Sequence, residues 1–285
     1  MKTATFQLHK PSSIAEVTQL LAAFSAEDGR VIAGGQSLVP SMMFRMAAPP
    51  HLIDINEVRE LSEVVISHEH ITIGATVRHV RFEQPVEPGP TGRLLARVVK
   101  HIAHYPIRTR GTFCGSLAQS DPSSEWCLAA ATLDATIVAE STRGRREIPV
   151  VQFFKGIMET ALEPDELLVA VRLPLLPEGT VTGFKEFSRR QGDYALSMAM
   201  ASWRVVDGLI SEARLGVGGA EAHPRRIKEA EDQLNGNAPS HELISLAAQT
   251  AAKLIDPLED VQADAEYRRD LVRAMSKRAM EQCLS

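Results

Sequence analysis

Two adjacent glycines separate a short apolar run from the expected start of a helix. The run is Arg30–Ala33, the glycines are Gly34 and Gly35, and the donor side chains Gln36 and Ser37 follow at once. Glycine lets a backbone approach a ligand or another segment closely, and successive amides can converge on an anion there. The pattern therefore predicts a strand–loop–helix unit whose loop is either a tight turn or a cradle for a negative group.

The residues around this loop predict alternating strands and helices up to residue 57. Ser13 and Glu16 form a capping box, which indicates a helix that begins after Ser13. A second helix is expected directly after the glycine loop, and the strand His51–Ile55 follows the helix-breaking pair Pro49-Pro50. We therefore expect the order strand, helix, strand, helix, strand.

Between Glu57 and Leu173 the sequence is richer in strands. The expected elements are a hairpin over 64–74, helices over 92–103 and 125–131, and strands over 135–139, 146–150 and 167–173. Residues 108–122 carry glycines and hydroxyl side chains and are expected to form a long loop, which in a compact domain usually has a function. The alternative is a solvated loop that leads into the next helix.

Two prolines, Pro174 and Pro177, mark the best candidate for a linker. The elements expected after it are strands over 184–187, 198–206 and 212–217 and helices over 226–234, 240–255 and 264–284. Asp207-Gly208 is a typical hairpin turn between two of these strands. This order, with strands and helices largely segregated, indicates the α+β class.

Charge and cysteine content exclude several kinds of protein. The net charge of −5 argues against a protein that follows nucleic-acid phosphates, and the 44% hydrophobic content argues against disorder. The cysteines Cys114, Cys127 and Cys283 are odd in number and form no CxxC pair, so neither a disulfide framework nor an iron–sulfur site is expected. Without a signal peptide or an apolar run near about 20 residues, we expect a cytoplasmic protein with no membrane span.

The remaining residues contain no complete catalytic set. The sequence lacks a Ser/His/Asp order, a Walker loop and a full GxGxxG fingerprint; Gly216–Gly219 resembles half a fingerprint without its acidic ribose partner. The histidines His68, His70, His101 and His104 are better explained as surface residues than as metal ligands. The residues by themselves therefore predict no catalytic side chain and no metal site.

Four motifs, taken in order, resemble those of the FAD-binding medium subunit of molybdenum hydroxylases. They are Val31–Pro40 with His51–Ile55, Gly111–Glu125, Glu163–Leu168 and Phe184–Ala195. This group includes aerobic carbon monoxide dehydrogenase and the xanthine, nicotinate and quinoline dehydrogenases. The resemblance covers essentially the whole chain, and four ordered motifs are far more specific than any one.

The fold implied by the resemblance has three parts. Residues 1–57 and 58–175 would form the two FAD-binding subdomains of the vanillyl-alcohol-oxidase type. Residues 178–285 would form a C-terminal domain of a three-stranded antiparallel sheet and a three-helix bundle.

The resemblance also implies a set of cofactor-binding residues. The members of the set are Val31, Ile32, Ala33, Gly34, Gly35, Gln36, Ser37, Leu38, Ile102, Ile107, Gly111, Thr112, Gly115, Ser116, Ser124, Glu125, Leu162, Leu168, Lys185 and Tyr194. The first motif would surround the FAD pyrophosphate with backbone amides, and the second would hold its other side. Ser124 and Glu125 would lie near the ribose or adenine, Lys185 near the flavin or its ribityl chain, and Tyr194 over a ring face.

Three residues depart from the family pattern. The family often has glycine where Cys114 stands, asparagine where Ser116 stands and aspartate where Glu125 stands. Each replacement keeps a small or polar group, so FAD binding is expected to survive with altered contacts. Cys114 is either a buried inert thiol or a group that tunes the flavin.

The implied function is electron transfer within a larger complex. A large subunit with a molybdenum cofactor and a small [2Fe–2S] subunit would be the partners, in a dimer of heterotrimers, with an external electron acceptor. Arg108, Arg110, Arg189 and Arg190 are candidates to guide docking of the small subunit, or are simply solvated or helix-capping charges. The alternatives are a free-standing flavin-dependent oxidoreductase and a non-enzymatic nucleotide-binding assembly protein.

Overall fold

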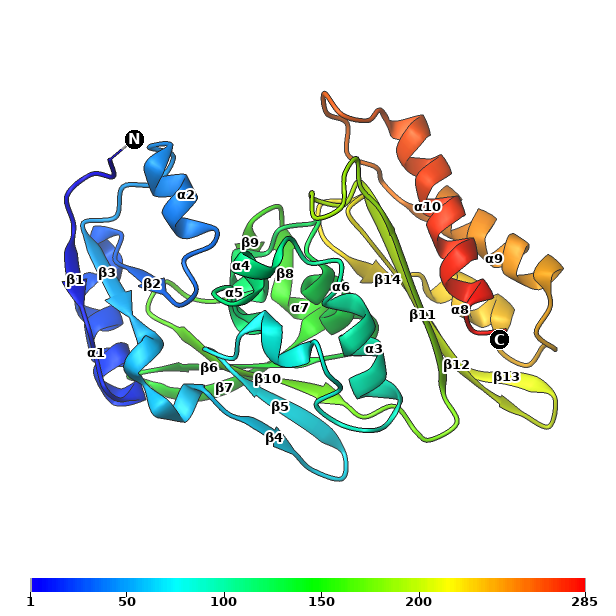
Figure 1. The fold of residues 1–285 in the computed structure, drawn as a ribbon, viewed down its shortest axis with the longest axis horizontal. Helices are drawn as coiled ribbons and strands as arrows, with labels where there is room; N and C mark the ends of the chain where they lie inside the picture. The colour runs from blue at the N-terminus through cyan, green and yellow to red at the C-terminus, as the bar shows by residue number, and fades with distance from the viewer. Residues whose placement is uncertain (1, 285) are drawn as a thin grey trace.

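The computed structural model describes residues 2–284, which form three units in a row (Figure 1). The N-terminal unit lies at one end, a strand-rich unit lies in the middle, and a sheet covered by long helices lies at the other end. No helix in the described part of the chain is long and apolar enough to cross a membrane.

The N-terminal unit is a small parallel sheet with two helices. Its elements are β1 (Gln7–His9), α1 (Ile14–Phe24), β2 (Arg30–Ile32), α2 (Leu38–Met43) and β3 (His51–Asp54), with β3 between β1 and β2. Ser13 caps α1 by accepting a hydrogen bond from the Glu16 amide (3.3 Å), as the capping box predicted. The predicted order of strands and helices is confirmed. Through α1, this unit packs against the sheet of the middle unit.

The middle unit is built on a five-stranded antiparallel sheet. Its strands are β4 (Val64–Ile66), β5 (His70–Gly74), β10 (Leu167–Pro174), β6 (Thr136–Ser141) and β7 (Gly144–Pro149), in that spatial order. Its remaining elements are α3 (Pro90–Val98), α4 (Tyr105–Arg108), α5 (Phe113–Gln119), α6 (Glu125–Thr132), α7 (Val150–Phe153) and the short hairpin β8 (Phe154–Gly156) and β9 (Glu159–Thr160).

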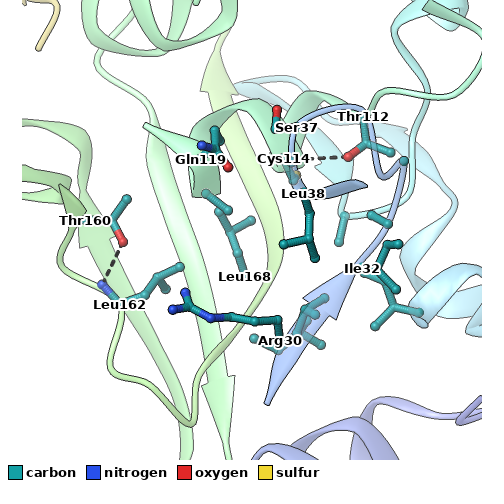
Figure 2. A pocket seen from close by; sticks show the side chains of 18 of the residues that line it. Arg30, Ile32, Ser37, Leu38, Thr112, Cys114, Gln119, Thr160, Leu162 and Leu168 are labelled. Atoms are coloured by element: carbon teal, nitrogen blue, oxygen red, sulfur yellow. Dashed lines mark hydrogen bonds between the residues drawn. The ribbon is translucent and has the colours of Figure 1, made fainter. Parts of the chain in front are cut away.

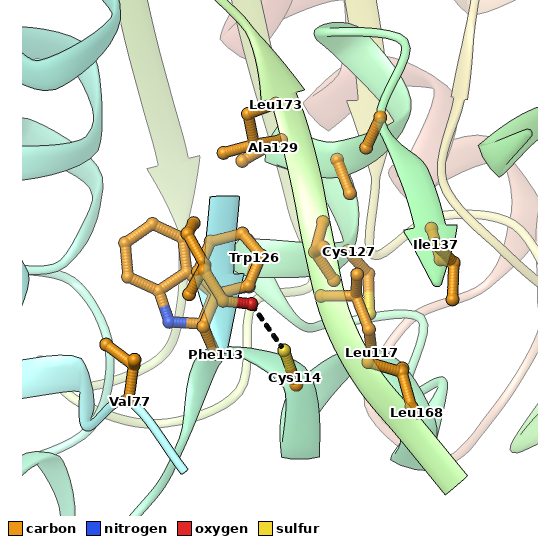
Figure 3. Packing of buried hydrophobic residues seen from close by; sticks show 14 of the residues in the cluster. Val77, Phe113, Cys114, Leu117, Trp126, Cys127, Ala129, Ile137, Leu168 and Leu173 are labelled. Atoms are coloured by element: carbon orange, nitrogen blue, oxygen red, sulfur yellow. Dashed lines mark hydrogen bonds between the residues drawn. The ribbon is translucent and has the colours of Figure 1, made fainter. Parts of the chain in front are cut away.

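The core of this unit is aromatic. Trp126 is fully buried on α6, and the centroid of its ring lies 4.8 Å from that of Phe113 and 5.2 Å from that of Phe82. Figure 3 shows Trp126 and Phe113 beside the buried thiols of Cys114 and Cys127. Because Phe113 starts α5 and Trp126 starts α6, the aromatic contact fixes both helices against the sheet.

Two predictions about this unit were wrong. The helix expected over 92–103 ends at Val98. After it, the amides of His101 and Ile102 donate to carbonyls three residues earlier, as in isolated turns, and Ala103 has a left-handed φ of +41°. The stretch 108–122, expected to be a loop, contains the helix α5. Thr112 caps that helix by accepting a hydrogen bond from the Gly115 amide (3.0 Å), and Phe113 and Leu117 bury one face of it. Burial of that face therefore outweighs the loop-like composition.

The C-terminal unit has four strands, not the three that the resemblance implied. They are β11 (Val181–Phe187), β12 (Ser197–Val206), β13 (Leu209–Gly218) and β14 (Arg225–Arg226), in that order and antiparallel. The fourth strand is only two residues long, and its second residue, Arg226, lies at the start of the helix expected over 226–234, which instead begins at Lys228. The helices are α8 (Lys228–Leu234), α9 (His241–Leu254) and α10 (Ala265–Glu281).

The C-terminal sheet is enclosed between two helical layers. Helix α10 packs on β11 and β12, α8 packs on β13, and α9 lies against both helices (Figure 1). The other face meets α3 and α6 of the middle unit, where Arg97 donates to the Thr182 carbonyl (2.6 Å). The three helices therefore pack on one another and cover one face of the sheet through α8 and α10.

Candidate cofactor-binding site

A cleft of about 620 Å³ lies between the N-terminal unit and the middle unit. Its walls are β2 with the loop that leads into α2, the start of α5, and the segment 158–168 (Figure 2). This volume lies within the usual range for sites that bury an organic ligand.

Gly34 is the point at which the two glycine-rich segments touch. A Cβ atom at this position would overlap the Arg110 carbonyl oxygen and would lie 2.7 Å from the Gly111 Cα. Gly35 plays a different part, because its φ of +69° is a left-handed conformation that side chains rarely adopt. The two glycines thus serve two separate needs: close approach at Gly34 and a left-handed turn at Gly35.

Each segment begins a helix at the edge of the cleft. The Val39 amide donates to the Gly35 carbonyl (3.0 Å), so the glycine loop runs directly into the first turn of α2, which begins at Leu38. Amides of a first helical turn have no acceptor within their own helix. Thr112 stands opposite, at the start of α5, and Ser37 lies near it in Figure 2. This end of the cleft offers hydrogen-bond donors suited to an anionic group.

Four apolar side chains line the other end of the cleft, beside the charged side chain of Arg30. Ile32 and Leu38 line one side and Leu162 and Leu168 the other (Figure 2). The turn that carries Leu162 is closed by Glu166, whose carboxylate accepts hydrogen bonds from Arg146 (2.6 and 2.7 Å) and from the Glu163 amide (2.8 Å). Such a slot suits a flat ring better than a phosphate.

The cleft brings together fourteen of the twenty residues that the sequence predicted. They are Val31, Ile32, Ala33, Gly34, Gly35, Gln36, Ser37, Leu38, Gly111, Thr112, Gly115, Ser116, Leu162 and Leu168. The other six lie outside its lining: Ile102, Ile107, Ser124, Glu125, Lys185 and Tyr194.

Several of these six residues lie near one another, towards the C-terminal unit. Ser123, just before α6, donates to the Ala195 carbonyl (2.8 Å), which brings the segment of Tyr194 to the start of that helix. Glu125 is buried in the first turn of α6, and Lys185 lies on β11. Ser124, Glu125, Lys185 and Tyr194 thus form a second group of predicted residues, outside the cleft and towards β11.

Glu125 is held in its neutral form by its surroundings. Burial, together with the smaller effect of the charges of Glu186 and Asp121, raises its pKa to about 8. Glu186 points its Oε1 at His101 Nδ1 (3.2 Å), while its Oε2 is buried without a hydrogen-bond partner. At neutral pH Glu125 therefore carries a proton and can donate a hydrogen bond.

Sequence reasoning missed His79, which lines the cleft beneath the second glycine segment. Its Nδ1 accepts a hydrogen bond from Trp126 (2.9 Å), and its amide donates to the Gly111 carbonyl (3.0 Å). Burial, together with the smaller effect of the nearby charges of Arg78 and Arg108, lowers the pKa of His79 to about 3. The ring is therefore neutral and acts as a rigid support for Gly111. No local sequence signal marks it, because its partner Trp126 is distant in the chain.

Arg30 and Cys114 also line the cleft and were not among the predicted binding residues. Cys114 is buried, and its thiol donates to the Ile73 carbonyl (3.4 Å). Burial raises the pKa of this thiol, which favours the inert form over a reactive thiolate. Arg108, considered as a docking residue, instead bonds Glu83 (2.8 Å) and the carbonyl of Ile102 (3.0 Å).

Comparison with known protein families gives this geometry a context. Residues 4–176 match the family described as "FAD binding domain in molybdopterin dehydrogenase", and residues 182–283 match the "CO dehydrogenase flavoprotein C-terminal domain". The chain belongs to the flavoprotein medium subunits of the molybdenum hydroxylases. The predictions of this family, of an oxidoreductase subunit and of FAD as its cofactor are confirmed.

Relatives of this medium subunit match it over almost their whole length. The nicotine 6-hydroxylase medium subunit of Paenarthrobacter nicotinovorans is 36% identical over 98% of each chain. Among solved structures, carbon monoxide dehydrogenase from Hydrogenophaga pseudoflava superposes with a TM-score of 0.95 at 32% identity, covering 100% of this chain and 99% of that one. Quinoline 2-oxidoreductase from Pseudomonas putida 86 gives 0.94 at 35% identity, covering 99% and 98%.

The residues of this medium subunit fit FAD. The close approach at Gly34 leaves no room for a side chain where the two segments meet, and the first-turn amides of α2 border the cleft beside it. The apolar slot at the other end matches a planar ring, and the neutral Glu125 can donate a hydrogen bond. FAD has a diphosphate between two ring systems. It therefore needs hydrogen-bond donors for the diphosphate next to an apolar slot for a ring.

Proposed function

We propose that this chain is the electron-transfer subunit of a molybdenum-containing hydroxylase or dehydrogenase. It would take electrons from iron–sulfur clusters of a partner subunit and pass them to an external acceptor. The contact between the glycine-rich segments at Gly34, beside an apolar slot, carries the proposal. Bound FAD supplies the redox chemistry, because it can exchange electrons one or two at a time, and the protein supplies orientation and electrostatics.

In this proposal the chain's residues bind and orient the cofactor. The amides between Gly34 and Leu38 would hold the diphosphate from one side, and the segment from Gly111 to Ser116 would hold it from the other. The group beside β11, with Lys185 and Tyr194, would face the flavin. No side chain is proposed to act as an acid, base or nucleophile, and residues 1–57, 58–175 and 178–285 are proposed as the three folding units.

The proposed partners are a large molybdenum-cofactor subunit and a small [2Fe–2S] subunit, in a dimer of heterotrimers. Relatives of this chain are named as medium chains or as a subunit of a dehydrogenase complex. A [2Fe–2S] cluster takes four protein ligands, commonly thiolates. The chain has three cysteines, each buried, and its described residues contain no cluster of metal-ligating side chains. We also propose a cytoplasmic location, which free thiols support.

The first prediction is that FAD is bound stoichiometrically and without a covalent link. The cysteines are buried and the lining histidine, His79, is held by Trp126, so neither these thiols nor this imidazole is free to form a covalent link to FAD. Acid precipitation of the purified holoprotein should release all flavin into the supernatant. Flavin that stays in the pellet would contradict non-covalent binding, and a chain that remains colourless after incubation with FAD would favour the assembly-protein alternative.

The second prediction is that the isolated chain oxidises no organic substrate. It should co-elute in size-exclusion chromatography with co-expressed large and small subunits from the same operon. Only the complex should reduce a dye in a substrate-dependent reaction. If the isolated holoprotein turned over substrate as fast as the complex, the free-standing oxidoreductase would be the correct assignment; failure to co-elute would exclude the proposed partners.

A further inference from the structure

Arg30 is the single lysine or arginine that lines the cleft, within residues 2–284. Figure 2 shows its side chain crossing from β2 towards Leu162, at the end of the cleft opposite Ser37 and Thr112. A cation placed to hold the diphosphate would lie at the donor-rich end. Arg30 lies instead at the apolar end.

The surroundings of Arg30 orient its planar head group. Its Nε donates to Asp28 Oδ1 (2.6 Å), a bond made along one edge of the guanidinium. Both partners of this ion pair are exposed, at 61% for Arg30 and 52% for Asp28, and the bond occupies only one edge of the guanidinium. Ile32 and Leu162 provide apolar walls beside it. A planar guanidinium held by one edge over apolar walls is suited to stack on an aromatic ring.

We propose that the Arg30 guanidinium stacks on the adenine ring of FAD and so makes the site selective for the adenine half of the dinucleotide. This assignment rests on the proposed function. The flavin end is directed elsewhere, because the residues proposed to face it lie outside the cleft, beside β11 and the start of α6. A diphosphate held between Gly34 and Gly111 then leaves the adenine for the slot at Arg30.

The test uses two variants and a matched control. Arg30→Met keeps the length and the apolar stem, and Arg30→Lys keeps the charge but not the plane. Arg273→Met is the control, because Arg273 forms a similar exposed pair with Asp270 (2.8 Å) on α10, away from the cleft. Apoprotein of each variant is titrated with FAD by quenching of flavin fluorescence, and ADP and FMN, which carry the adenine and the flavin of FAD respectively, are measured as competitors.

Arg30→Met should weaken FAD and ADP by about tenfold and leave FMN unchanged within about twofold. Arg30→Lys should restore only a small part of the loss, and Arg273→Met should match the wild type. Unchanged FAD affinity in Arg30→Met, an equal loss for FMN, or full rescue by lysine would overturn stacking on adenine while leaving FAD binding intact. A wild-type chain that binds no FAD would instead overturn the proposed function.

Discussion

Replacing Gly34 with alanine is expected to abolish FAD binding. The added methyl would overlap the Arg110 carbonyl oxygen and press on the Gly111 Cα, so the two segments that border the cleft must move apart. Neither neighbour is the flexible end of a side chain, and Gly111 is itself backed by the buried ring of His79. Overpacking of this kind costs about 3 kcal/mol, which corresponds to a loss of affinity of at least about 100-fold.

The matched control for this substitution is Gly156→Ala. The methyl added there meets only the movable carboxylate of Glu159, at 3.3 Å. Both variants are purified without added flavin, and the flavin-to-protein absorbance ratio is compared before and after incubation with FAD. Wild-type occupancy in Gly34→Ala would mean that the contact between the two segments is not needed for the cofactor.

Replacing Glu125 with glutamine is expected to stabilise the apoprotein at alkaline pH. Folding raises the pKa of Glu125 from its ordinary value of 4.5 to about 8, chiefly through burial. Between these values the folded chain keeps a proton that the unfolded chain has released, so this group lowers stability as the pH rises. Glutamine has nearly the same shape and nothing to ionise. The free energy of unfolding should therefore increase by roughly 4 kcal/mol at pH 8.

The pH dependence of the increase in the free energy of unfolding identifies its cause. Denaturant titrations at pH 4.5 should show little difference between Glu125→Gln and the wild type, since both chains are then largely neutral at this position. The control Glu178→Gln alters an exposed loop carboxylate and should change neither curve. A gain that is the same at both pH values would point to packing rather than to the buried proton.

Much of the fold could be predicted because its signals are local. The capping box at Ser13, the paired glycines and the Asp207-Gly208 turn each act over a few residues, and each is confirmed by the structure. Helix α5 escaped prediction because its stability comes from Phe113 against Trp126, a contact between different elements. The strand β14 has two residues and no pattern of its own.

The residues of the candidate site also divide into those that local sequence motifs mark and those that only the fold brings together. The glycines and the apolar residues that line the cleft stand in recognisable motifs, so the sequence placed them in one set. The sequence does not indicate that Gly34, rather than Gly35, touches the second glycine-rich segment. That close approach depends on residues 110 and 111, which are far along the chain. His79 was missed for the same reason, because only the fold brings it to Trp126 and Gly111.

Because the cleft lies between the first two units, bound FAD is expected to affect how fast the protein is degraded in the cell. The N-terminal unit has strands of only three or four residues, and a unit of this size is only marginally stable by itself. A dinucleotide that bridges the seam adds its binding free energy to the resistance of this unit against local opening. Flavin supply would then govern proteolytic turnover: in flavin-starved cells, degradation should begin within the first 57 residues, and riboflavin feeding should lengthen the half-life of the chain.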